Sequence, residues 1–118
     1  MQPGAYDLNT YQGDTARWLM TFRENVDGVS GDPIDLTGYV GKAQIRSEPS
    51  STVVVVEMSV SLSNQTTNPG EVTITAPASQ TANLVLEEYV WDLQFTMPSG
   101  DVQTFLAGKV NNTLQVTR

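Results

Sequence analysis

The sequence predicts an all-β protein, an immunoglobulin-like antiparallel β-sandwich of about seven to eight strands. Apolar and polar side chains alternate in several short segments, which is the pattern of a strand with one buried face. Clusters of Gly, Pro, Asn and Asp separate these segments at spacings of roughly ten to fifteen residues. No segment has the period of a long amphipathic helix.

The densest apolar face belongs to residues 89–97, which we expect to form the central strand of the core. Its alternate positions carry large apolar side chains: Tyr89, Trp91, Leu93, Phe95 and Met97. Leu84 and Tyr89 have a spacing typical of the corner before a late strand in immunoglobulin-like sandwiches. Turn residues 98–101 then lead into a strand over 102–110, so the two strands should pair antiparallel.

The other strands are expected at Tyr6–Thr10, Thr15–Arg23, Tyr39–Arg46, Val53–Leu62, Glu71–Thr75 and Leu114–Val116. A loop is expected over Glu24–Pro33, because this segment is rich in Gly, Asp, Asn and Ser. Asn111 and Asn112 should turn the chain before the last strand. Residues 78–83 should form about one helical turn between two sheets.

Length and composition limit the possible classes of protein. The 118 residues suffice for one domain over 1–118, with termini, Met1–Ala5 and the last few residues, that are mobile or docked on partners. Cys and His are absent, which excludes disulfides, thiolate chemistry and the commonest general base. The formal charge of −7 works against binding to nucleic acid or to an anionic membrane.

Neither a membrane span nor a secretion signal is predicted. No stretch approaches the ~20 apolar residues that a transmembrane helix needs. The N-terminus has neither a basic start nor an apolar run, so the chain is expected to begin in the cytoplasm.

The residue pattern favours no catalytic, cofactor or metal site. Without His, a hydrolytic triad would need a Lys base, and Lys42 and Lys109 lie on expected outward faces. Glu87 and Glu88 are adjacent in an extended segment, so their carboxylates point apart. A calcium site is the alternative interpretation of four acidic residues, but their spacing is not that of an EF-hand, which favours a solvated loop. These residues are Glu24, Asp27, Asp32 and Asp35.

Asp92 lies on the expected outer face of the central strand. It could pair there with Arg17, Arg46 or Lys109, and such a surface pair would contribute at most about 1 kcal/mol.

Three aromatic residues, Trp18, Tyr39 and Trp91, are the only basis for a carbohydrate-binding module. Their positions in the alternating pattern place them inward, which favours core packing instead. Gly41 and Ala43 leave room in the same core for a bulky neighbour such as Trp18 or Trp91.

Val53 and Val55 form the candidate interface. They add apolar residues to the outward-facing positions of the expected strand 53–62, whose other face is apolar as well. A contact with a neighbouring subunit explains this pattern, and a strand partly covered by a loop explains it equally well.

The order of several motifs resembles the small immunoglobulin-like proteins of tailed bacteriophages, including the N-terminal module of upper-baseplate proteins. The motifs are Gly13-Asp14-Thr15, Asp35-Leu36-Thr37-Gly38-Tyr39 followed by Ala43-Gln44-Ile45-Arg46, Gly70-x-Val72-x-Ile74, Gln80-Thr81-Ala82-x-Leu84, Tyr89-Val90-Trp91-Asp92-Leu93 and Val116-Thr117-Arg118. The likeness spans nearly the whole chain. Glu88 departs from it, because Gly would be more typical before the Tyr.

The resemblance implies a non-enzymatic virion structural protein, assembled in the host cytoplasm and located in the tail, the baseplate or a tail-fibre attachment. It implies no catalytic residues and no cofactor. Its partners would be other virion proteins and further copies of itself in a symmetric assembly, with trimers or hexamers expected. The alternatives are a capsid decoration protein and, from another class, the carbohydrate-binding module.

Overall fold

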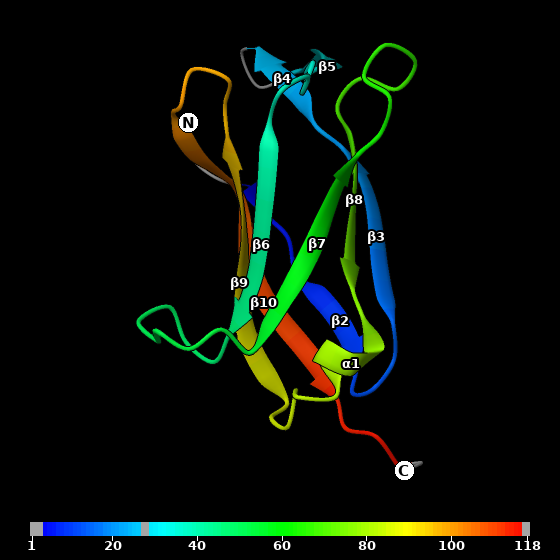
Figure 1. Ribbon diagram of the computed structural model, residues 1–118, viewed down its shortest axis with the longest axis vertical. Coiled ribbons are helices and arrows are strands. Elements are labelled where there is room, and N and C mark those ends of the chain that lie inside the picture. The colour runs from blue at the N-terminus through cyan, green and yellow to red at the C-terminus, as the bar shows by residue number, and fades with distance from the viewer. Residues whose placement is uncertain (1–3, 27–28, 117–118) are drawn as a thin grey trace.

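The computed structural model describes residues 4–26 and 29–116. Nearly all regular structure in this part of the chain is β, and one short helix is present (Figure 1). The elements are β1 Gly4–Ala5, β2 Leu8–Tyr11, β3 Ala16–Thr21, β4 Arg23–Val26, β5 Val29–Pro33, β6 Val40–Arg46, β7 Val56–Leu62, β8 Glu71–Ala76, α1 Ala78–Thr81, β9 Glu88–Thr96 and β10 Val102–Thr113. The predicted all-β, sandwich-like fold class is confirmed.

β9 is the central strand, as predicted. It pairs antiparallel with β10 on one side and with β6 on the other. Its inward side chains at 89, 91, 93 and 95 are buried, while those at 88, 92, 94 and 96 are exposed. The predicted turn 98–101 closes the β9–β10 hairpin, where the Met97 amide donates to the Asp101 carbonyl over 2.8 Å.

β7 joins the two layers of the fold. Its first half pairs with β6 and its second half, Ser59–Leu62, pairs with β8. The hydrogen-bonded order is β1-β10-β9-β6-β7-β8-β3, with β2 also on β10. Figure 1 shows β7 running obliquely between these layers, so that one continuous sheet curls around the core.

The N-terminal segment departs from the antiparallel expectation. The predicted strand Tyr6–Thr10 is present in part as β2, and β1 precedes it; both pair parallel to β10. Gly108 allows this arrangement, because a Cβ there would collide with the carbonyl group of Tyr6. Residues 1–3 and 117–118, which include most of the expected mobile termini, lie outside the described residues.

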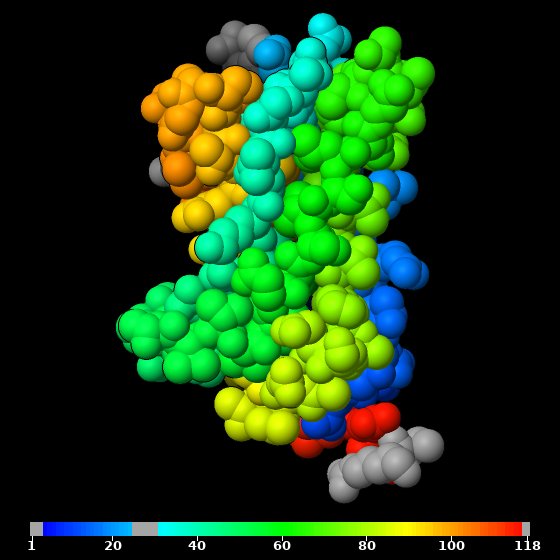
Figure 2. All heavy atoms as spheres, in the orientation of Figure 1, coloured from blue at the N-terminus to red at the C-terminus, as the bar shows by residue number. Residues whose placement is uncertain are grey.

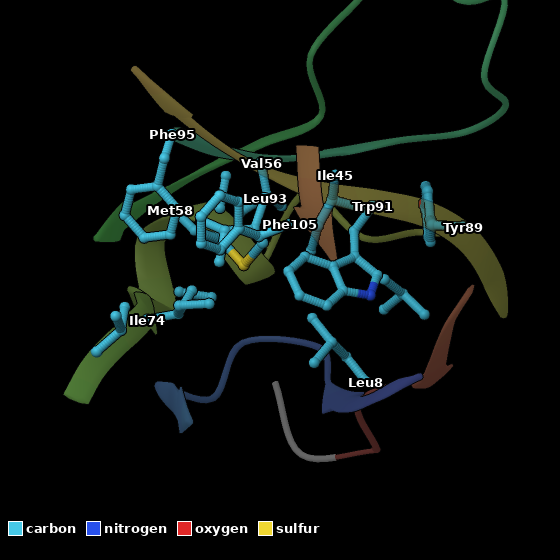
Figure 3. Close-up of a cluster of buried hydrophobic side chains, with 14 of the residues drawn as sticks. Leu8, Ile45, Val56, Met58, Ile74, Tyr89, Trp91, Leu93, Phe95 and Phe105 are labelled. Carbon is cyan, nitrogen blue, oxygen red and sulfur yellow. The ribbon is translucent and has the colours of Figure 1, made fainter. Parts of the chain in front are cut away.

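The core lies between the layers and contains the side chains that alternation predicted. Trp91 lies among Ile45, Leu93 and Leu8, and its indole Nε1 donates to the Tyr6 carbonyl over 2.7 Å (Figure 3). Phe95 makes edge-to-face contacts with several other rings: Phe22, Tyr39 and Phe105.

The space at Gly41 is filled by Val60 and by a bulky neighbour, as expected, but this neighbour is Phe95 and neither Trp18 nor Trp91. A Cβ on Gly41 would lie 2.9 Å from Phe95 Cε1 and closer still to Val60 Cγ1. The position therefore requires glycine because side chains of the two neighbouring strands, β7 and β9, pack directly on its backbone.

The loop predicted over Glu24–Pro33 is wrong, because this segment forms the β4–β5 hairpin. Only two residues, 27 and 28, separate the strands, and they lie outside the described residues. Ile34 then donates its amide to the Phe22 carbonyl over 2.9 Å, which ties the hairpin to the end of β3.

The predictions for the last part of the chain need three corrections. A register shift between Thr104 and Leu106 breaks the expected alternation, so Phe105 is buried and Val102 is exposed. β10 continues through the predicted turn at Asn111 and Asn112 to Thr113. No strand forms over the described residues 114–116.

Asn112 can occupy a buried strand position because its polar groups are satisfied. Its side-chain amide donates to the carbonyls of Leu84 and Leu86, each over 2.9 Å, and its oxygen accepts from the Thr10 hydroxyl over 2.8 Å. A turn-forming residue is therefore accommodated inside the strand.

The predicted corner before β9 is present as a hydrogen bond. The Leu86 amide donates to the Tyr89 hydroxyl over 2.8 Å, and Leu84 is fully buried beneath it. This side-chain-to-backbone bond is the feature that gives the tyrosine corner its name. Across the described residues, no helix is both long and apolar enough to span a bilayer.

Candidate interaction surfaces

Val53 and Val55, the predicted interface residues, lie just before β7 and not within a strand. The strand begins at Val56, and residues 47–55 form a segment that projects from the body (Figure 2). Val53 is 65% exposed on this segment, whereas Val55 is partly buried against the core. The two side chains therefore do not form one outward patch, and Val53 alone is available for an external contact.

Arg46 holds the base of the projecting segment in place. Its guanidinium donates to the Ser51 carbonyl over 2.6 Å and to Gln44 Oε1 over 2.9 Å. Val55 donates its amide to the Ile45 carbonyl over 2.9 Å, which returns the chain to the sheet. These contacts anchor both ends of the projecting segment to the sheet, and Val53 lies exposed between them.

A hollow lies on the outer face of the sheet beside the projecting segment. It consists of two adjoining recesses of about 270 and 230 Å³ that share three lining side chains, Gln44, Arg46 and Asp92. Val90, Ala107 and Pro49 add apolar surface to the larger recess. Lys42 and Gln94 line the smaller one.

The hollow carries mixed charge. Partial desolvation raises the pKa of Asp92, and the nearby Arg46 charge lowers it in part. Of the three predicted partners for Asp92, Arg46 lines the same recesses and acts on it electrostatically. Carboxylate, guanidinium and amide groups can hydrogen-bond a polar ligand or a peptide, but no nucleophile paired with a base lines these recesses.

The other residues considered for catalysis or metal binding do not lie together. Lys109 and Glu87 are exposed, and Glu88 begins β9 as an exposed residue. Among the described residues, no group of three or more acidic side chains lies close enough to hold a metal ion. Asp27, one member of the calcium alternative, lies outside the described residues.

Asp35, another member of the acidic group, stabilises the local backbone. Its Oδ1 accepts from the Thr37 hydroxyl over 2.6 Å and from the Thr37 amide over 3.0 Å. The hydroxyl contact, followed by the amide contact, holds the pKa of this carboxyl below its usual range. The Asp35-Leu36-Thr37-Gly38 motif is thus a structural corner before β6.

The three aromatic candidates for carbohydrate binding face the core, as predicted. Trp91 is buried, and Tyr39 packs edge-to-face on Phe95 with ring centroids 6.0 Å apart. Trp18 is partly buried against the same core. All three side chains therefore contribute to core packing.

A second apolar surface, which the sequence analysis missed, lies at the end of the molecule near the C-terminus. Five exposed large apolar residues gather there, and we call this surface the C-terminal pole: Tyr11, Val85, Leu86, Leu114 and Val116. Leu114, Val116 and Tyr11 line a largely apolar recess of about 260 Å³. Figure 1 shows the end of β10, the end of β2 and the segment between α1 and β9 at this end.

Hydrogen bonds hold the three segments of the C-terminal pole together. Gln12 donates its backbone amide to the Thr113 carbonyl over 2.9 Å and its side-chain amide to the Ala82 carbonyl over 3.3 Å. Asn112 binds the carbonyls of Leu84 and Leu86. Because the segments are distant in sequence, neither alternation nor spacing could have predicted that their apolar residues meet.

Comparison with known proteins gives little further information. No family model matches the chain, and no curated protein matches it. Among solved structures, that of a mutant SrpA adhesin from Streptococcus sanguinis is similar, at 10% sequence identity and a TM-score of 0.47. The alignment covers 92% of this chain and 55% of the adhesin chain, so this chain spans about half of that length. A likeness this weak carries no functional inference.

Proposed function

We propose that the chain is a non-enzymatic structural protein of a bacteriophage particle, in the tail, the baseplate or a tail-fibre attachment. The ordered motifs of the sequence support this assignment. The observation that carries the mechanism is the C-terminal pole, where five large apolar side chains are exposed on hydrogen-bonded segments. Exposed apolar groups gathered in this way are typical of protein-protein contact sites.

The corner motifs that carry the resemblance have structural roles in this chain. Asp35 fixes the corner before β6, and Tyr89 fixes the corner before β9. They support a likeness of architecture to the tail-region modules. Partner choice would then depend on the surface residues outside these motifs.

The C-terminal pole would act by surface complementarity. Leu86 is 53% exposed and Val85 is 64% exposed, so a partner that covers them removes apolar area from water. Asp14 and Glu87 are exposed in the same segments. A partner surface with an apolar centre and basic residues at its rim would match both features.

Immunogold electron microscopy of particles produced from the genome that encodes this chain tests the assignment. Label at the tail end is the expected result. Label over the head would replace it with capsid decoration, in which the same surfaces clamp capsomers. Particles without label, in a preparation where a known tail protein is labelled, would contradict a virion role.

A further inference from the structure

β3 is a long free edge of the curled sheet. It is the last strand of the hydrogen-bonded order, opposite β1, and in the described part of the chain its neighbour is β8 alone. β3 has six residues, whereas β1 has two. Unpaired backbone groups along an edge of this length are a template for another strand.

The register identifies which backbone groups point outward. The Phe22 amide donates to the Gly70 carbonyl over 2.9 Å, and Met20 lies opposite Val72. Hydrogen-bonded pairs alternate along an antiparallel ladder, so the even-numbered residues of β3 direct their N–H and C=O groups at β8. The groups of Arg17, Leu19 and Thr21 therefore point away from the sheet.

Both faces of the edge carry an accessible apolar side chain, although Arg17 and Thr21 flank Leu19 on the outer face. Leu19 is 67% exposed on the outer face, and Trp18 and Met20 on the inner face are only partly buried. Of the usual protections of an edge, β3 has one charged residue, Arg17, but it has no Pro and its pairing with β8 contains no bulge.

We propose that β3 pairs antiparallel with β3 of a second copy, with Leu19 opposite Leu19 on the twofold axis. In this register each Arg17 faces Thr21 of the other copy. Thr21 lies beside Glu71 on the same face of the sheet, and strands are about 4.8 Å apart. The Arg17 side chain can therefore extend past Thr21 to the Glu71 carboxylate of the other copy, and symmetry makes this contact twice.

Charge and side-chain contacts favour this register over the registers shifted by two residues in either direction. A shift by two residues in one direction would place Arg17 opposite Arg23, which is repulsive. A shift in the other direction would place Arg17 opposite Leu19 and separate the two Leu19 side chains. The edge is thus complementary to itself, which favours a second copy as its partner. This self-association goes beyond the proposed virion role and does not depend on it.

A charge exchange tests the contact by sedimentation equilibrium. Arg17→Glu and Glu71→Arg should each raise the dimer dissociation constant about tenfold. The double variant Arg17→Glu/Glu71→Arg should restore it, because the same pair then forms with exchanged charges. Val40→Lys is the matched control, since Val40 is also 67% exposed, and it should leave the constant unchanged. Circular dichroism checks that each variant is folded.

A chain that remains monomeric up to its solubility limit would overturn the proposal. A double variant no tighter than the single variants, or an equal effect of Val40→Lys, would overturn it as well.

Single cysteines test the register directly, because the natural chain has none. The two Leu19 residues would form a hydrogen-bonded pair, whose Cα atoms lie about 5.5 Å apart, a distance that a disulfide can bridge. Leu19→Cys should therefore form a disulfide-linked dimer under mild oxidation. Thr21→Cys should not, because Thr21 faces Arg17. Equal crosslinking of the two variants would contradict the register.

Discussion

At the residue scale, the corner before β9 gives a sharp test of the structure. Tyr89→Phe removes the hydroxyl that accepts from the Leu86 amide, while the ring stays in the core. We expect a loss of about 1 kcal/mol in the free energy of unfolding, measured by urea denaturation. Tyr11→Phe is the control, because Tyr11 is 60% exposed and should show no change. Equal losses in both variants would contradict the corner.

Asp92 should make the stability of the protein fall with rising pH. The pKa of Asp92 is raised from 3.8, so the unfolded state releases this proton first as pH increases. The free energy of unfolding then decreases through the window above 3.8, and Asp92→Asn removes this decrease. Urea denaturation of both proteins from pH 3 to pH 7 should show the variant gaining relative stability.

Asp35→Asn provides a comparison of opposite sign. The pKa of Asp35 is lowered by Thr37, so its contribution is present at neutral pH and is lost as pH falls. The Asn variant should lose relative stability on going from pH 3 to pH 7. The same pH dependence in both variants would show that the local environments of Asp92 and Asp35 are described wrongly.

Some residue roles were predictable from the sequence and others were not. Alternation predicted the burial of Trp91 and Phe95, because a strand directs successive side chains to opposite faces. Asn112 was not predictable, since its burial depends on carbonyl groups of Leu84 and Leu86 from a distant segment. The same limit explains Gly41, whose neighbours belong to other strands.

At the scale of elements, the bulge in β10 determines which side chains enter the core. Phe105→Ala should cost about 3 to 5 kcal/mol in the free energy of unfolding, because the buried ring packs edge-to-face on both Phe22 and Phe95. Val102→Ala should cost less than about 0.5 kcal/mol, because Val102 is 58% exposed. Thermal or chemical unfolding of both variants measures these values. The opposite order would support the uninterrupted alternation that the sequence alone predicts.

The errors at this scale have identifiable causes. A register shift leaves no mark in a pattern of apolar residues, so alternation through Val102 and Leu106 looked continuous. For the β4–β5 hairpin the signal was present, because Asp27-Gly28 is a dipeptide typical of two-residue hairpin connections. The Gly, Asp, Asn and Ser content of Glu24–Pro33 predicted a loop, although this dipeptide indicated a hairpin.

At the scale of the whole molecule, the C-terminal pole should determine incorporation into particles. Leu86→Asp puts a charge on the apolar surface of the pole, so particles from a host that supplies only this variant should contain much less of the chain. Val102→Asp is the control, since Val102 is similarly exposed but lies away from the C-terminal pole. Quantitative immunoblotting of purified particles measures the effect. Equal incorporation of the two variants would exclude this surface as the docking site.

The most direct test of the central claim is quantitative mass spectrometry of purified particles, with an isotope-labelled copy of this chain as the internal standard. A virion component built into a symmetric tail should be present in a fixed copy number per particle, in a multiple of three or six, as trimers or hexamers require. Absence of the chain from particles that contain their other tail proteins in full amount would contradict the proposed function.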